Sequence, residues 1–183
     1  MRIKKNLVIL LNLLLLLGFF NWSVLKKEKT LADGKLVLLK LAPVDPRSLL
    51  QGDYMRLNYA ISQVPDLDSL ASRGYVVVRV DTGNVAHLVR YQKKSLPLAP
   101  GEQLIRYSKT EWAVHIGAES YFFEEGQGDL FAQAAFGGLR VDEQGNSILT
   151  GLYTAQRRQL SPAPRRQGKG HLPPNRRAAT GDF

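Results

Sequence analysis

The hydrophobic positions of this chain form one long N-terminal block, followed by short segments with a period of two. Residues 7–25 are an uncharged run of 19 in which Leu, Ile, Val and Phe predominate. At about 1.5 Å of rise per residue, such a helix is roughly 28 Å long, close to the ~30 Å hydrocarbon core of a bilayer. It is apolar on every face, unlike the amphipathic helices of small soluble domains. We therefore predict a transmembrane helix over residues 7–25.

Basic residues flank this run on both sides. Three of them lie within residues 1–6, and the excess of positive charge on the cytoplasmic side of membrane helices predicts a cytoplasmic N-terminus. A cleaved signal peptide is the alternative, although the run is longer than a usual signal-peptide core. The basic cluster at 26–29 competes with the N-terminal charges for the cytoplasmic side. We expect an uncleaved anchor, a linker over residues 26–34 and the remaining chain outside the cytoplasm.

Beyond residue 34, apolar positions follow the two-residue period of β-strands. Apolar side chains at 55, 57, 59 and 61 alternate with other residues, which predicts a strand with one buried face. Residues 75–80 are almost continuously apolar, as in a central strand covered on both sides. Residues 85–91 follow the turn sequence Asp81-Thr82-Gly83-Asn84, so the two segments are expected to form a hairpin. The same criteria predict further strands at residues 35–41, 112–116, 120–123, 139–141 and 147–152.

Helical signals in this part of the chain are short. We expect a single turn over residues 45–50 and about two turns each over 66–72 and 129–136, the last ended by Gly137-Gly138. The predicted fold is therefore mainly β, a sheet or open barrel with short helical decorations over residues 35–155. Residues 156–183 are basic, rich in Pro and Gly and without apolar period, which is typical of a disordered tail.

The net charge of +9 raises the question of nucleic-acid binding. Divided by segment, residues 1–29 carry +5 and residues 157–183 carry +6, which leaves −2 on residues 30–156. A nucleic-acid-binding domain is expected to concentrate positive charge on its folded part. We therefore expect no nucleic-acid partner. The chain has no cysteine, which removes disulfides, thiolate metal sites and cysteine nucleophiles.

The most distinctive segment contains the string Gly52-Asp53-Tyr54-x-x-Leu57-x-Tyr59. This string resembles the signature of the GDYXXLXY protein family, and a second segment over residues 116–128 is similar to sequences of the same family. The resemblance covers roughly residues 35–155. It implies a short bacterial envelope protein with an N-terminal hydrophobic segment, often encoded beside or fused to multi-spanning membrane proteins. It implies no activity, cofactor or catalytic residue.

The first motif has a structural interpretation that needs no ligand. Gly52 can adopt a left-handed conformation, and Asp53 can close the turn through backbone N–H groups. Leu57 and Tyr59 share one strand face and are expected to enter the core, whereas Tyr54 points the other way. The functional interpretation makes Arg47, Asp53 and Tyr54 the rim of a binding groove.

The second motif reads Gly117-Ala118-Glu119-Ser120-Tyr121-Phe122-Phe123-Glu124-Glu125-Gly126. Carboxylates beside aromatic rings suit contacts with a cation, a sugar or a peptide, and they suit equally an exposed strand end. Neighbouring strand residues point to opposite faces, so Glu124 and Glu125 cannot act as a facing catalytic pair. We list Glu119, Tyr121 and Glu124 as binding candidates, with Gly117 and Gly126 as structural positions.

Three functional hypotheses remain open at this point. The leading one is a non-enzymatic binding or assembly module, held in the bacterial cytoplasmic membrane and facing the periplasm or cell exterior, whose partner is a multi-spanning membrane protein. The second is a hydrolase or lyase that acts on an envelope polymer through Asp53, Glu119 and Glu124. The third is a lipid or polysaccharide carrier with a cavity lined by aromatic residues, including Tyr54 and Trp112. The three histidines lack the spacing of a metal site, and we expect no cofactor.

Overall fold

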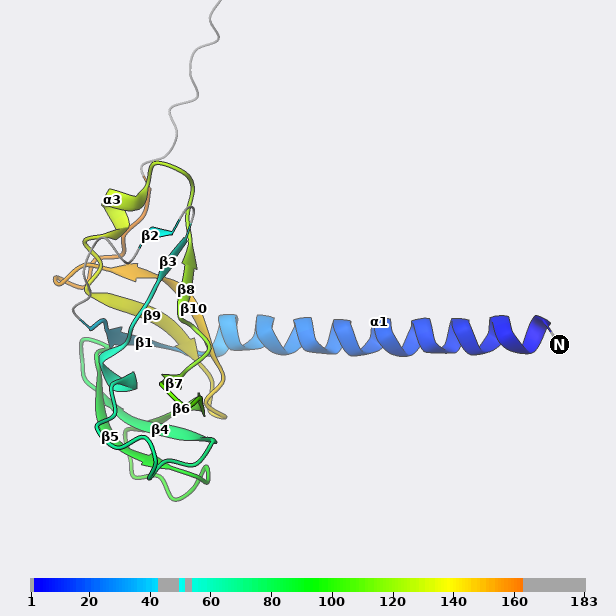
Figure 1. The fold of residues 1–183 in the computed structure, drawn as a ribbon, viewed down its shortest axis with the longest axis horizontal. Helices are drawn as coiled ribbons and strands as arrows, with labels where there is room; N and C mark the ends of the chain where they lie inside the picture. The colour runs from blue at the N-terminus through cyan, green and yellow to red at the C-terminus, as the bar shows by residue number, and fades with distance from the viewer. Residues whose placement is uncertain (1, 43–49, 52–53, 163–183) are drawn as a thin grey trace, which may run out of the picture.

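The molecule consists of a long helical stalk and a β-rich domain (Figure 1). The computed structural model describes residues 2–42, 50–51 and 54–162. Helix α1 (Arg2–Asp33) is uninterrupted, and its portion over Asn6–Asp33 is long and apolar enough to cross a membrane. This confirms the predicted N-terminal apolar helix. Most of the turn expected over 45–50, the residues Arg47, Gly52 and Asp53, and most of the tail expected over 156–183 fall outside the described residues.

The described residues of the domain form three small antiparallel sheets, so the prediction of a mainly β fold is confirmed. The first has the order β1-β9-β10, built from β1 (Lys35–Lys40), β9 (Phe136–Val141) and β10 (Ser147–Tyr153). The second has the order β2-β3-β8, built from β2 (Leu50–Gln51), β3 (Tyr54–Arg56) and β8 (Ser120–Phe122). The third has the order β5-β4-β6-β7, built from β4 (Arg73–Val80), β5 (Ala86–Gln92), β6 (Glu102–Lys109) and β7 (Val114–His115).

Both predicted hairpins are present, and their turn residues explain why. Between β4 and β5, the Asp81 carboxylate accepts the backbone N–H groups of Gly83 and Val85, each at 2.8 Å, and Asn84 takes a positive φ of 63°. Between β9 and β10, the Asp142 carboxylate accepts the backbone N–H groups of Gln144 and Asn146. Aspartate and asparagine favour such turns because their side chains bond to nearby backbone groups.

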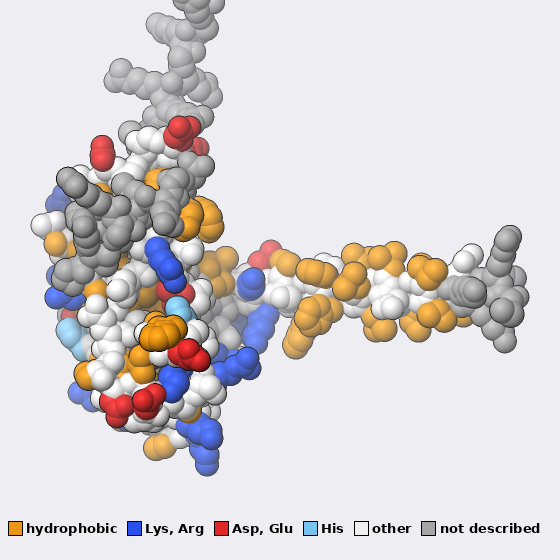
Figure 2. All heavy atoms as spheres, in the orientation of Figure 1, with side chains coloured by type: hydrophobic (Ala, Val, Ile, Leu, Met, Phe, Trp, Pro, Cys, Tyr) orange, Lys and Arg blue, Asp and Glu red, His pale blue; other side chains and the backbone are white. Residues whose placement is uncertain are grey.

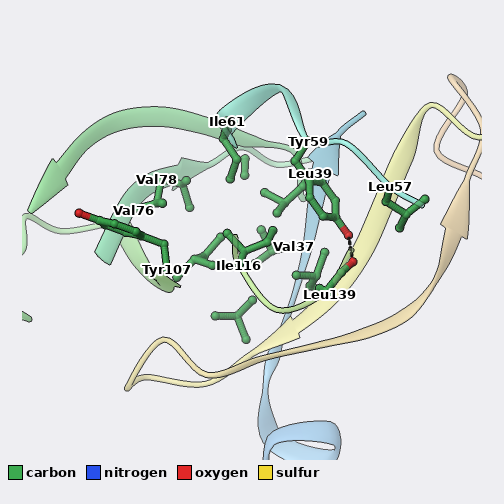
Figure 3. Close-up of a cluster of buried hydrophobic side chains, with 14 of the residues drawn as sticks. Val37, Leu39, Leu57, Tyr59, Ile61, Val76, Val78, Tyr107, Ile116 and Leu139 are labelled. Carbon is green, nitrogen blue, oxygen red and sulfur yellow. Dashed lines mark hydrogen bonds between the residues drawn. The ribbon is translucent and has the colours of Figure 1, made fainter. Parts of the chain in front are cut away.

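One hydrophobic core is shared by the three sheets (Figure 3). The alternation predicted over residues 55–61 is confirmed, because every second side chain in this stretch is buried although only residues 54–56 form a strand there. The 3-10 helix η1 (Ala60–Ser62) completes the segment. The core residues drawn and labelled in Figure 3 come from segments throughout the domain: Val37, Leu39, Leu57, Tyr59, Ile61, Val76, Val78, Tyr107, Ile116 and Leu139.

Of the two predicted helices that the structure describes, one is absent and the other is shorter than expected. No helix forms over residues 66–72, where the Asp66 carboxylate and carbonyl bind the N–H and hydroxyl of Ser69 in a local turn. The helix expected over 129–136 is the single turn α3 (Gly128–Phe131), and Phe136 already belongs to β9. The residues after α3 form a strand instead of a helix because β9 is the central strand of its sheet and pairs with β1 on one side and β10 on the other.

The described domain also extends past both expected boundaries. Residues 26–33, expected to be a linker, are the last two turns of α1. At the other end, Leu160 is buried in the core and its N–H donates to the carbonyl of Leu152. The domain therefore begins on the helix and continues to about residue 160.

Candidate functional site

The two sequence motifs meet in one small sheet. Strand β3 pairs antiparallel with β8, with Tyr54 opposite Phe122 and Met55 opposite Tyr121. Side chains on paired strands lie a few ångströms apart, so segments more than 60 residues apart in sequence form one surface. This surface is the candidate site that the sequence motifs define.

On the inner side, the first motif is tied to the second through Tyr59. Tyr59 is 1 % exposed, and its hydroxyl donates a 2.6 Å hydrogen bond to the carbonyl of Ala118, the dashed line in Figure 3. Burial, together with the negative charge of Glu119, raises the pKa of the Tyr59 hydroxyl well above its usual range, so it remains a neutral donor. A Cβ on Gly137 would lie 2.8 Å from the Tyr59 ring, so only glycine leaves room for it. Tyr59 is therefore a core residue, and Leu57 is 3 % exposed beside it.

Glu119 is engaged in holding a turn. Its carboxylate oxygen Oε1 accepts the backbone N–H groups of Ile116 at 2.6 Å and Gly117 at 3.1 Å. Gly117 has a φ of 78°, in the left-handed region that favours glycine. The carbonyl of Glu119 also accepts the N–H of Leu57. The side chain thus fixes the chain entering β8 and binds the second motif to the first.

On the outer side, aromatic rings from both motifs form the surface. The rings of Tyr54 and Phe122 lie 5.7 Å apart, and Phe122 is 73 % exposed. Tyr121 and Phe123 point the other way and pack on Phe131, with ring centroids 5.0 and 5.4 Å away. Successive side chains of this strand therefore point to opposite faces, as the sequence predicts, and Phe122 faces the solvent.

An open hollow of about 350 Å³ borders this sheet. Glu124 lies on its rim in the turn that follows β8, accepts a 3.3 Å hydrogen bond from the Gln127 amide, and is followed by Gly126 with a φ of 82°. Aromatic walls with one carboxylate suit an apolar or cationic group of a partner. Trp112, expected to line a carrier cavity, is not part of the wall and is 85 % exposed. The hollow is lined by Tyr121, Phe122, Phe123, Glu124, Gln127, Phe131 and Pro162.

A catalytic arrangement of the predicted acids does not emerge from the described residues. Glu119 is occupied by two backbone N–H groups, and Asp53 lies outside the described chain together with Arg47 and Gly52. Within the part of the chain that the structure describes, no three His, Cys, Asp or Glu side chains group so that they could hold a metal ion.

The contact that the sequence analysis missed joins α1 to the domain. Thr30, 3 % exposed, donates its hydroxyl proton toward the Asp142 carboxylate at 3.0 Å and the Lys26 carbonyl at 3.1 Å. Arg140 on β9 donates a 2.9 Å hydrogen bond to the carbonyl of Gly34. Burial alone would raise the pKa of Asp142, but hydrogen bonds from Asn146, Thr30 and the Gln144 amide outweigh it and lower that pKa. The last turn of the helix is thus fixed to the β9–β10 hairpin.

These features define a class: a small mainly β domain mounted on one long apolar N-terminal helix. The GDYXXLXY protein family model matches residues 16–152, about three quarters of the chain, so the chain belongs to that family. The match includes the C-terminal half of α1 as well as both motifs. No curated protein and no solved structure matches the chain significantly.

Proposed function

We propose that this protein is a membrane-tethered, non-enzymatic binding module whose partner is a multi-spanning membrane protein. One observation carries the proposal: α1 runs without a break from its apolar stretch into the domain and is docked there by partly buried hydrogen bonds of Thr30 and Arg140. A domain on a flexible linker samples many orientations, whereas a docked helix holds the domain at one height and angle above the bilayer. That arrangement suits a partner within the same membrane.

Basic residues lie at both ends of the apolar stretch, three before it and three lysines at 26–29 after it, and we base the direction of insertion on the first group. Basic residues before the apolar stretch favour a cytoplasmic N-terminus, which places the domain in the periplasm or outside the cell. The membrane in question is then the bacterial cytoplasmic membrane. Figure 2 shows hydrophobic side chains along the outer part of α1 and basic side chains near its junction with the domain.

The contact surface we assign is the outer side of the β3–β8 pair. Exposed aromatic side chains are frequent anchors at protein interfaces because they bury a large area at a small cost in conformational entropy. Phe122 is exposed, stacks beside Tyr54 and borders the hollow with Glu124 on its rim. A partner that inserts an apolar or cationic side chain there would contact the second motif, and Tyr54 of the first motif lies beside Phe122 at its border.

The alternatives have less support. A hydrolase acting through Glu119 would need that carboxylate free to face a substrate, whereas it accepts two backbone N–H groups. A carrier would need an enclosed cavity, whereas the aromatic residues Tyr121 and Phe123 pack against Phe131 and border an open hollow.

Crosslinking and mass spectrometry on the full-length protein in native membranes test the proposal. We compare the wild type with Phe122→Ser, which removes an exposed ring at the assigned surface, and with Trp112→Ser, which removes an equally exposed ring on the turn between β6 and β7. We expect one specific multi-spanning membrane protein to crosslink to the wild type and to Trp112→Ser. Its yield should fall several-fold for Phe122→Ser.

Two results would count against the proposal. If no membrane protein crosslinks specifically to the wild type, the binding function is wrong. If Trp112→Ser loses the partner and Phe122→Ser keeps it, the module binds but the assigned surface is wrong. Extraction at alkaline pH must show that all three proteins remain in the membrane, because a domain released from the membrane would lose the partner for another reason.

A further inference from the structure

A second hollow, of about 330 Å³, lies where α1 meets the domain. Its walls come from the last two turns of the helix, the start of β1, the start of β6 and the β9–β10 turn. No described residue of either sequence motif lines it. The lining residues are Lys26, Lys29, Thr30, Asp33, Lys35, Gln103, Val141, Asp142, Glu143 and Gln144. We name this hollow the junction groove.

The depth of the junction groove follows from the helix rise. The uncharged run ends at Leu25, so at about 1.5 Å per residue Lys29 lies roughly 6 Å and Asp33 roughly 12 Å farther along the axis. The polar headgroup layer adds about 5–7 Å to each side of the hydrocarbon core. Side chains of a helix tilt toward its N-terminus, here toward the bilayer. The groove therefore runs from the level of the lipid headgroups, at Lys26 and Lys29, to a few ångströms beyond it, at Asp33.

The lysines of the groove are available to a ligand. Lys26, Lys29 and Lys35 are exposed, and none forms an ion pair with a described residue. Lysine ammonium groups bind phosphate as point charges. Lys26 and Lys29 are the two that lie nearest the bilayer, where the phosphate of a phospholipid lies.

The acidic side chains of the groove are not all equivalent. Asp142 is occupied by Thr30, Asn146 and two backbone N–H groups of its own turn. Asp33 and Glu143 make no ion pair with a described residue. Asp33 lies one helical turn farther from the bilayer than Lys29. The groove thus presents Lys26 and Lys29 near the membrane and the carboxylate of Asp33 farther out, with Lys35 two residues after Asp33.

From this order of charges we infer that the junction groove binds the headgroup of an ethanolamine phospholipid. The phosphate is held by Lys26, Lys29 and Lys35, and the primary ammonium group farther out donates hydrogen bonds to Asp33 and Glu143. A zwitterionic headgroup matches a lining in which positive and negative side chains are balanced. A choline headgroup has the same charges but no N–H to donate, and a glycerol headgroup has no positive charge. This inference rests on the membrane anchoring proposed above.

Native mass spectrometry of the full-length protein in detergent micelles tests the inference. The probes are phosphatidylethanolamine, phosphatidylcholine and phosphatidylglycerol with identical acyl chains. We expect the wild type to bind the ethanolamine lipid severalfold more tightly than the other two. In Lys29→Gln/Lys35→Gln, affinity for the ethanolamine lipid should fall about tenfold, since each lysine contributes to attraction of a phosphate at the membrane surface. Lys26 is retained so that the charge next to the span is unchanged.

Two further variants test the carboxylates of the groove and the specificity of its lysines. Asp33→Ala/Glu143→Ala should bring ethanolamine and choline lipids to equal affinity, because it removes the acceptors that distinguish them. Lys40→Gln/Lys94→Gln removes the same number of exposed lysines outside the groove and should bind lipid like the wild type.

The inference is overturned by any of three results. The first is equal binding of the three lipids by the wild type, the second is tighter binding of phosphatidylglycerol, and the third is an unchanged lipid preference in both groove variants. Water-soluble phosphoethanolamine is added as a competitor; if it binds as tightly as the lipid, the ligand is a soluble phosphate compound and the lipid assignment is wrong. Extraction of the wild type from membranes is the control for the anchor. If the wild type is not inserted in the membrane, the proposed function is wrong; if it is inserted and any of the results above is obtained, only the lipid inference is wrong.

Discussion

At the scale of single residues, the motif that names the family is explained mainly by packing. Leu57 and Tyr59 fill the core, and Tyr59 also satisfies the buried carbonyl of Ala118. The ring lies against Gly137, so the same tyrosine requires a glycine 78 positions later. Because each of these contacts is internal, loss of Tyr59 should affect folding before it affects any partner.

The hydroxyl of Tyr59 can be tested on its own. Tyr59→Phe keeps the ring and leaves the Ala118 carbonyl without its 2.6 Å partner, so we expect a loss of about 1–2 kcal/mol in the free energy of unfolding. Urea unfolding of the full-length protein in detergent measures it. Tyr75→Phe is the control, since the Tyr75 hydroxyl makes no hydrogen bond with a described residue. An equal effect of both substitutions would show that the hydrogen bond contributes little.

Substitutions of Glu119 test whether its carboxylate has a structural or a catalytic role. In Glu119→Gln, an amide oxygen can still accept the N–H groups of Ile116 and Gly117, so stability should fall by less than about 1 kcal/mol. Glu119→Ala leaves both N–H groups without that acceptor, and we expect a loss of about 1–3 kcal/mol. Thermal unfolding and partner crosslinking are measured side by side. Retained stability with complete loss of function in Glu119→Gln would contradict the structural role.

At the scale of secondary-structure elements, the four-stranded sheet contains an ion pair that spans a strand. Arg90 on β5 reaches across β4 to Glu102 on β6, with N–O distances of 2.7 and 2.9 Å, and the Glu102 side chain is 3 % exposed. Arg90 also donates to the carbonyl of Pro97, and Glu102 accepts the N–H of Ala99. The pair therefore ties the β5–β6 connection to the sheet.

Because of this ion pair, the free energy of unfolding should decrease at acid pH. The hydrogen bond from Arg90 and that from the Ala99 amide lower the pKa of Glu102 from 4.5 to about 2. A carboxylate with a lowered folded-state pKa contributes stability that is complete above about pH 4.5 and is lost as the pH falls through 2. We expect wild type and Glu102→Gln to differ in melting temperature at pH 6 and to converge toward pH 2. Glu111→Gln, at an exposed acid before β7, should show no such convergence.

The elements differ in how well their sequences predict them. The β4–β5 and β9–β10 hairpins were predicted because Asp81 and Asp142 begin turns whose chemistry is local. Strand β6 was missed. Gln103, Leu104 and Ile105 are all buried, and the Gln103 amide donates to the carbonyl of Asp142, so the two-residue alternation is absent from the first half of the strand. Its position in the sheet depends on pairing with β4, whose residues lie 23 to 35 positions earlier in the chain.

Helix predictions failed for the same reason. Residues around Leu67 and Leu70 have helical spacing, but the Leu67 carbonyl accepts the Lys109 ammonium and the Leu70 N–H within a turn. At the candidate site, the sequence indicated the two motifs but not that Tyr54 and Phe122 would stand side by side. Strand pairing between distant segments is set by the whole core and has no local signal.

At the scale of the whole molecule, the central question is whether the helix and the domain move as one body. The segment over 26–34 looks like a charged linker in sequence because Thr30, its buried residue, is isolated among lysines. In the structure it forms the base of the junction groove and contacts Asp142. Both proposals depend on this docking: the partner surface needs a fixed orientation, and the groove needs both of its walls.

Gly34 provides a sharp test of that docking. A Cβ at Gly34 would be placed against the Thr30 carbonyl oxygen and 3.1 Å from the Val141 backbone nitrogen, both main-chain atoms that cannot move aside alone. Gly34→Ala should therefore displace the helix end from β9, whereas Gly18→Ala, in the same helix, meets nothing within 4 Å. Because the chain has no cysteine, spin labels at Leu17→Cys and Glu125→Cys report one helix-to-domain distance.

We expect a narrow distance distribution between the two labels for the wild type and Gly18→Ala, and a broad or shifted one for Gly34→Ala. The domain of Gly34→Ala should remain folded, with a melting temperature a few degrees lower, because the strain falls at its edge. Partner crosslinking and ethanolamine-lipid preference should then both decrease in Gly34→Ala, although neither assigned surface has been substituted. A narrow, unchanged distribution with both activities intact would mean that the junction tolerates the methyl group and that orientation is fixed elsewhere. A distribution that is broad already in the wild type would show that the helix and domain are not one body, and the reason for placing the partner in the same membrane would be lost.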